Sequence, residues 1–111
     1  MTENTEKTAD DVLLDDTLNE LDMTSHDDGA KRKIKDIMQR GKARLEDLAG
    51  AKIDFAKDMM ARELLFSYCR YGRSNAIEQF EHDFSCQLTA FSLEAAVAGM
   101  PESGAADEGK V

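Results

Sequence analysis

The sequence has 111 residues, of which 33% are charged, and a formal net charge of −9 at pH 7. This length allows one domain, and no stretch approaches the ~20 consecutive apolar residues of a membrane-spanning helix. The first residues lack the basic and apolar regions of a signal peptide. We therefore expect a protein that is made in the cytoplasm and has no membrane partner, with Cys69 and Cys86 reduced.

Charge is distributed in blocks along the chain. Residues 1–28 hold ten acids and one base, and residues 74–111 hold seven acids and one base. Between them, residues 29–73 hold six acids and twelve bases. Such blocks can be complementary between copies of one chain, because the basic surface of one subunit can face the acidic segments of the next. The simpler interpretation is that the charges form solvated helix faces and polar tails.

Residues 1–28 are predicted to form an acidic N-terminal arm. Leu14, Leu18 and Leu21 fall on one helical face, which predicts a short helix over residues 11–23 with Asp10 or Asp11 at its start. Residues 24–29 (TSHDDG) are rich in turn formers and mark the boundary between this arm and the main domain. The first ten residues show no periodicity and are expected to be disordered.

The next predicted helix begins near Asp28 and ends at Gly50. Its apolar stripe includes a glycine, Gly41, where a larger side chain would be usual. Glycine in a helix interior costs about 1 kcal/mol relative to alanine, so we expect another helix to cross closely at Gly41. The stripe consists of Ile34, Ile37, Met38, Gly41, Leu45 and Leu48.

The central predicted helix begins at Asp54 or Asp58 and carries the densest apolar run of the chain. Its apolar residues cover a wide arc, which is typical of a helix buried on several sides. Gly72 is expected to end it, because glycine accepts the left-handed backbone that commonly closes a helix. The apolar positions are Met60, Leu64, Leu65, Tyr68, Cys69 and Tyr71.

After this break the chain is predicted to restart as one long helix. Asn75 is a suitable N-cap, and Glu78 lies three residues further on, as in a capping box. The apolar face then runs at helical spacing as far as Ala95, through Ile77, Phe80, Phe84, Leu88 and Phe91. Gly99, Pro101 and Gly104 do not allow the helix to continue.

The fold class predicted from these elements is all-α. Three core helices form a domain over residues 29–97, an extra helix lies in the N-terminal arm, and residues 98–111 form a flexible C-terminal tail. A folding unit of this size buries only about 60% of its unfolded surface, so it gains stability from self-assembly. The predicted structural core consists of Ile34, Gly41, Leu45, Leu64, Tyr68, Tyr71, Asn75, Phe80, Phe84 and Leu88.

The sequence contains no recognisable catalytic or metal-binding motif. His26 and His82 have no second ligand at a metal-like spacing, and no serine has a histidine partner in a recognisable motif. We therefore predict no catalytic, cofactor-binding or metal-binding residue. The basic run that begins at Lys31 lacks a recognisable reading motif for specific DNA recognition, although loose contact with a phosphate backbone fits its charge.

Three segments resemble the small head-to-tail connector, or adaptor, proteins of long-tailed bacteriophages. They are GKARLEDLAGAKIDF (41–55), ELLFSYCRYGRSNAIEQFEHDF (63–84) and the following QLTAFSLEA. In that family a helix ends in a short LAG loop with an aromatic anchor. A leucine-rich helix then ends in Arg-Tyr, and an Asn-containing restart leads to a Phe-bearing helix. The resemblance spans about residues 28–95 and is a pattern of apolar positions, without a catalytic signature.

The resemblance implies a helical subunit that forms a ring, typically a dodecamer, under the portal protein. Such a ring belongs to the virion, at the interface of head and tail, and is assembled in the host bacterial cytoplasm. It completes the head, extends the channel through which DNA passes without sequence-specific contact, and offers a platform to the stopper or tail-completion protein. In that family the C-terminal end of the adaptor engages the portal.

Two sets of residues are assigned to these contacts. The subunit interface is predicted at Lys31, Arg32, Lys35, Arg70 and Arg73, and portal docking at Val97, Met100 and Val111. The competing hypothesis is a small acidic phage or plasmid regulator or inhibitor, which binds a protein or imitates nucleic acid with its carboxylates. A regulator of this kind is expected to be a monomer or dimer, whereas a connector forms rings or binds the portal.

Overall fold

The computed structural model describes residues 8–23 and 27–98, which form an all-α fold, as predicted. No strand occurs in these residues, and none of their helices is both long enough and apolar enough to cross a membrane. The helices are α1 (Ala9–Glu20), α2 (Asp28–Ala49), α3 (Met59–Arg73), α4 (Ile77–Asp83) and α5 (Ser85–Ala98).

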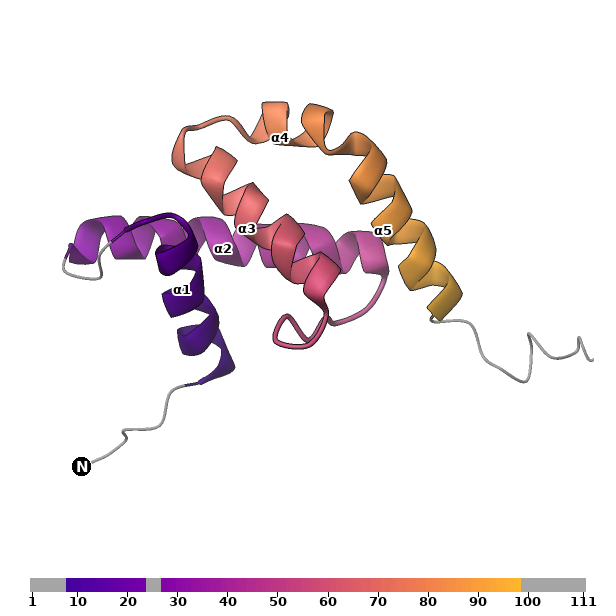
Figure 1. Cartoon of the computed structure of the whole chain (residues 1–111), viewed down its shortest axis with the longest axis horizontal. Coiled ribbons are helices and arrows are strands. Elements are labelled where there is room, and N and C mark those ends of the chain that lie inside the picture. The colour runs from indigo at the N-terminus through magenta and orange to yellow at the C-terminus, as the bar shows by residue number, and fades with distance from the viewer. Residues whose placement is uncertain (1–7, 24–26, 99–111) are drawn as a thin grey trace, which may run out of the picture.

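The longest helix, α2, is the platform of the fold (Figure 1). Helices α1, α3 and α5 all pack on it, and the α2–α3 contact is the most extensive. The short helix α4 connects the end of α3 to the start of α5 and also packs on both. Helices α1 and α5 do not touch each other, and Figure 1 shows them at different places along α2.

Side-chain caps begin the first three helices. Asp27 and Asp58 accept hydrogen bonds from the backbone N–H groups of Ala30 and Ala61, at 3.0 and 3.1 Å. Helix α1 begins earlier than predicted, because Thr8 is its N-cap and forms a reciprocal capping box with Asp11. The arrangement satisfies backbone donors that the first turn of a helix leaves without a partner.

The prediction that Gly72 ends the central helix was wrong. Helix α3 continues to Arg73, and the residue with a left-handed backbone is Asn75, at φ 57°. The Ala76 N–H donates to the Tyr71 carbonyl at 2.8 Å and the Asn75 N–H donates to the Gly72 carbonyl at 3.0 Å. This is the bonding pattern of a Schellman motif, with asparagine where glycine is commoner. Asn75 therefore closes α3, and α4 starts at Ile77 with Ala76 as an N-cap that supplies no side-chain hydrogen bond.

Gly72 has a packing role instead. A Cβ atom at this position would lie 2.6 Å from Ile37 Cγ2 on α2. At Gly41, a Cβ atom would lie 2.8 Å from both Leu65 Cδ1 and Tyr68 Cδ1 on α3. The close crossing predicted at Gly41 is confirmed, and the two glycines bring α2 and α3 together at two points along their contact.

The last predicted helix is divided into two. Phe84 separates α4 from α5 with φ −105° and ψ 17°, although the backbone bonds Phe84 N–H to Phe80 carbonyl and Leu88 N–H to Phe84 carbonyl persist at 2.9 and 2.8 Å. The break allows Phe80 to pack against the aromatic residues of α3 while Leu88 and Phe91 pack toward α2.

One hydrophobic core extends through all five helices. The leucines of α1 belong to it, so the predicted arm packs with the domain, and the buried Thr17 hydroxyl donates back to the Leu13 carbonyl at 2.7 Å. Of the predicted core residues, Tyr71 and Phe84 are half-buried and Asn75 is an exposed turn residue, which corrects its assignment. The others are buried: Ile34, Gly41, Leu45, Leu64, Tyr68, Phe80 and Leu88.

Candidate protein interface

Helix α5 is apolar on two opposite sides. Leu88 and Phe91 face the core, and Ser92 Oγ donates to the Leu48 carbonyl at 3.0 Å. The opposite side carries Cys86, Ala90, Leu93 and Val97, all exposed, at spacings of four, three and four residues. We call these four residues the outer strip. Leu93 and Val97 are 63% and 69% exposed, and Glu94 is the only charged residue of the helix.

The sequence analysis did not identify the outer strip as a unit. Only Val97 was singled out, as a portal-docking residue, while Met100 and Val111 of the same prediction lie outside the described residues. The signal was nevertheless present, because a helix with apolar residues on two opposite sides is expected to be buried on both. An uncovered apolar side on such a helix indicates a protein contact.

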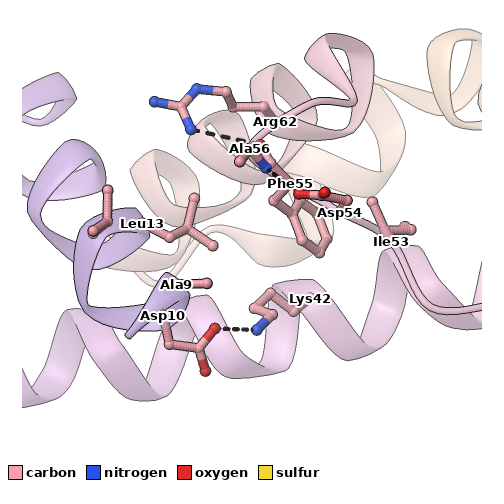
Figure 2. A pocket seen from close by; sticks show the side chains of 10 residues that line it. Ala9, Asp10, Leu13, Lys42, Ile53, Asp54, Phe55, Ala56 and Arg62 are labelled. Carbon is pink, nitrogen blue, oxygen red and sulfur yellow. Dashed lines mark hydrogen bonds and ion pairs between the residues drawn. The ribbon is translucent and has the colours of Figure 1, made fainter. Parts of the chain in front are cut away.

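An apolar pocket lies between α1 and the connection from α2 to α3 (Figure 2). It has a volume of about 320 Å³. Phe55, only 4% exposed, and Ile53 come from the connection, and Leu13 and the 47% exposed Val12 come from α1. We call this hollow the α1 pocket. Its lining is completed by Ala9, Asp10, Lys42, Asp54, Ala56 and Arg62.

Two basic side chains, Lys42 and Arg62, line the α1 pocket, and each forms an ion pair with a carboxylate of α1. Lys42 Nζ lies 2.5 Å from Asp10 Oδ1, and Arg62 Nη2 lies 2.6 Å from Asp16 Oδ2. Arg62 also donates to the Phe55 carbonyl at 3.5 Å, which ties α3 to the connection (Figure 2). The pocket therefore has apolar walls and a rim of fixed charges.

The predicted interface residues fall into two groups. Arg70 lies 3.9 Å from Glu20, and Arg73 donates to the Leu21 carbonyl at 2.8 Å, so both contact α1 of the same chain. Some of the opposite charges of the acidic N-terminal arm (residues 1–28) and the basic segment (residues 29–73) are thus paired within one subunit. Lys31, Arg32 and Lys35 lie in the first turns of α2, and none forms an ion pair with a described residue.

The contact between Asp10 and Lys42 gives a testable pH dependence. The hydrogen bond from Lys42, followed by one from Gln39, lowers the pKa of the Asp10 carboxyl below its usual value. A carboxyl group whose pKa is lower in the folded chain than in the unfolded chain stabilises the fold at pH values above its unfolded pKa. This contribution is lost as the pH falls through the pKa of the folded chain.

We therefore expect Asp10→Asn to lower the free energy of unfolding at pH 7 by less than about 1 kcal/mol, as for an exposed pair. At about pH 3 the difference from the wild type should shrink. Urea denaturation followed by circular dichroism at the two pH values measures both effects. Asp47→Asn, at an exposed acid of α2, is the matched control, and an equal pH dependence in the two variants would contradict the role of Lys42.

A polar cluster joins α3 to α4. Tyr71 Oη donates to Asp83 Oδ2 at 2.9 Å, and Gln79 Nε2 donates to Asp83 Oδ1 at 2.7 Å. The Gln79, His82 and Tyr71 contacts together lower the pKa of Asp83, and the bond to Asp83 raises the pKa of Tyr71. The cluster does not line the α1 pocket, and we assign it a role in holding α4 against α3.

No group of three or more His, Cys, Asp or Glu residues that could hold a metal ion occurs in residues 8–23 and 27–98. Burial raises the pKa of the Cys69 thiol to about 12, so this thiol is protonated at neutral pH. Comparison of the chain with protein-family models, with curated proteins and with solved structures gives no match, so its function is inferred from the surfaces above.

Proposed function

We propose that this chain is the ring-forming subunit of a head-to-tail connector of a long-tailed bacteriophage. It is assembled in the host cytoplasm and occupies the virion between the portal and the stopper or tail, where the ring, a dodecamer by the resemblance, extends the DNA channel. The observation that carries the proposal is the outer strip of α5. Burial of apolar surface contributes about 25 cal/mol per Å², and another protein must cover the strip for the chain to gain this energy.

The placement of the acidic arm favours a connector over a regulator that imitates nucleic acid. Asp10, Asp16 and Glu20 are each paired with a base of their own chain. Imitation of a phosphate backbone requires carboxylates that are free to meet the partner's cations. These three carboxylates instead fasten α1 to α2 and α3.

The bases of α2 supply the remaining contacts of the proposal. Lys31, Arg32 and Lys35 have no ion-pair partner among the described residues. In a ring they are available to the acidic segments of a neighbouring subunit or to the phosphates of DNA that passes through the channel. Both contacts are electrostatic and weaken as salt is added, since the Debye length is about 8 Å at physiological ionic strength.

Electron microscopy of the purified chain, alone and mixed with portal protein, tests the proposal. We expect rings that cap the portal. A chain truncated after Ala98, which ends with α5, should still form rings but lose portal binding, because it lacks Met100 and Val111. The full-length chain in the same preparation is the control.

Two results would count against this assignment. A monomer or dimer that ignores the portal would favour the regulator. Normal portal binding by the truncated chain would move the docking role to another segment. Leu14 and Leu18 of α1 and Leu21 at its C-cap are not available for that role in this fold, because all three are buried in the core.

A further inference from the structure

Helix α1 is an acidic element at the edge of the fold. It packs on α2 and α3 and touches neither α4 nor α5 (Figure 1). Residues 8–23, which contain it, hold six acids and no base. A helix of 12 residues is marginal in isolation, so α1 depends on a surface to dock on.

The surface that receives α1 matches it in polarity and in charge. Its middle is apolar, and the buried Thr17 of α1 lies against Met38 there, with Oγ1 and Sδ 3.9 Å apart. Its rim is basic, because three of its side chains form ion pairs with α1 carboxylates and a fourth donates to the carbonyl of the α1 C-cap. We call this surface the α1 seat, and it consists of Met38, Lys42, Arg62, Arg70 and Arg73.

The occupant that suits the seat is therefore an acidic amphipathic helix, and α1 is the example at hand. The four bases of the seat outnumber Asp54, an acid that lines the α1 pocket beside Lys42 and whose Oδ1 accepts the Ala56 N–H at 3.0 Å. Every copy of the chain carries the same helix and the same seat. The α1 helix of a second copy thus fits the seat as well as the helix of its own chain.

The attachment of α1 to its own chain is less complete than the packing between α2 and α3. The α1 pocket leaves about 320 Å³ of open space between α1 and the α2–α3 connection. In the two shortest ion pairs, the Asp10 and Asp16 side chains are 43% and 41% exposed, and pairs open to solvent contribute little to stability. Directly after the helix, Asp22 has a left-handed backbone at φ 56°, which is unfavourable for a residue with a side chain. Release of α1 therefore costs less than unfolding of the domain.

The length of the chain between α1 and α2 limits where a released helix can dock. Leu21 is the C-cap of α1 and α2 begins at Asp28. The backbone between these two residues spans at most about 25 Å when it is fully extended. A seat on another chain is within reach only if that chain lies directly beside the first, as an adjacent subunit of an assembly does.

We propose that α1 is exchanged between adjacent copies of this chain, so that α1 of one subunit occupies the α1 seat of the next. Exchange replaces each contact by an identical one, and for this reason it is a low-cost route to assembly. Repeated in one direction, the contact is heterologous and closes a ring. In dilute solution α1 stays on its own seat, because the short connection keeps it at a high effective concentration. This inference rests on the proposed ring and names the element that joins its subunits.

Cross-linking of the wild-type chain tests the exchange. A carbodiimide joins an amine to a carboxylate in direct contact, as Lys42 Nζ and Asp10 Oδ1 are at 2.5 Å. Isotope-labelled and unlabelled chains are mixed in equal amounts, concentrated until they assemble, cross-linked and digested. Mass spectrometry should find the Asp10–Lys42 link between one labelled and one unlabelled peptide as often as between two peptides of the same kind. The same mixture cross-linked while dilute is the control and should give only links between peptides of the same kind.

Charge reversal gives an independent test. One variant reverses α1, with Asp10→Lys and Asp16→Arg, and the other reverses the seat, with Lys42→Asp and Arg62→Asp. Each variant alone brings like charges together, both within a chain and between copies. Its melting temperature should fall, and the apparent Kd of self-association should rise at least about a hundredfold. In an equimolar mixture, opposite charges meet only if the helices are exchanged. The mixture should therefore recover the melting temperature and form species with equal numbers of the two variants, as measured by native mass spectrometry.

The chain with all four substitutions is the matched control, because it has the same side chains as the mixture and can pair them within one chain. It should assemble like the wild type, and if it does not fold, the cross-linking result decides alone.

Three outcomes would overturn the proposal. They are an assembled wild-type chain with links only between peptides of the same kind, a mixture that stays unassociated while the four-substitution control is restored, and a wild-type chain that remains monomeric up to millimolar concentration. Portal binding is measured separately, so exchanged rings that fail to bind portal would refute the connector function while supporting the exchange.

Discussion

Replacement of Phe80 by alanine is expected to unfold a large fraction of the isolated chain. The Phe80 ring is fully buried, and its centroid lies 5.3 Å from that of Tyr68, 5.9 Å from that of Tyr71 and 5.0 Å from that of Phe84. Loss of a buried phenylalanine typically costs about 3–5 kcal/mol. Natural domains have only about 5–15 kcal/mol of stability in total, so the variant should melt near or below ambient temperature.

Phe84→Ala is the matched control, because Phe84 belongs to the same aromatic cluster but is only half-buried. Urea denaturation followed by circular dichroism should show a clearly smaller loss of stability for Phe84→Ala than for Phe80→Ala. Equal losses would mean that the cluster acts as one unit and that the deeper burial of Phe80 adds little to the stability of the fold.

The second large effect is expected from Gly41→Leu. A leucine at this position drives its Cβ into Leu65 and Tyr68, each of which has a side-chain carbon 2.8 Å from where that Cβ would lie. Overpacking of this kind costs typically about 1–3 kcal/mol. In a domain of this size each kcal/mol lowers the melting temperature by roughly 4–8 °C.

Ala43→Leu provides the comparison, since Ala43 is exposed two residues further along the same helix. Both substitutions introduce leucine into α2, but only the one at Gly41 disturbs the contact with α3. Thermal melting of the two variants separates packing from helix propensity. A melting temperature for Gly41→Leu equal to that of Ala43→Leu would show that α2 and α3 can move apart with little loss of stability.

Helical periodicity predicted the fold class well, because each helix has to bury one face. It also predicted the close crossing at Gly41, since a glycine within an apolar stripe lowers helix stability unless a neighbouring helix uses the space. Local pattern failed at Gly72 and Asn75, where either residue suits a left-handed turn. The position of the glycine is decided by packing. Ile37, which lies 35 positions earlier in the chain, leaves no room for a side chain at residue 72, so glycine is needed there and Asn75 forms the turn.

The candidate interface was less predictable. Opposite charges in the arm and the middle predicted an electrostatic contact, but whether Arg70 meets an acid of its own chain or of a neighbour depends on where α1 docks. Likewise, the apolar residues of α5 predicted a buried helix without indicating that Leu93 and Val97 face away from the core. Both questions are decided by contacts between distant segments, which a periodic pattern does not encode.

The position of α5 in the chain also matters during synthesis. A polypeptide emerges from its N-terminus at roughly 5–20 residues per second, and its earlier parts begin to fold first. Helices α1, α2 and α3 precede α5 and pack on one another, so they can associate while α5 is still being made. The outer strip is thus among the last parts of the described chain to emerge. This order shortens the time during which a nascent chain presents an adhesive apolar surface to other unfinished chains.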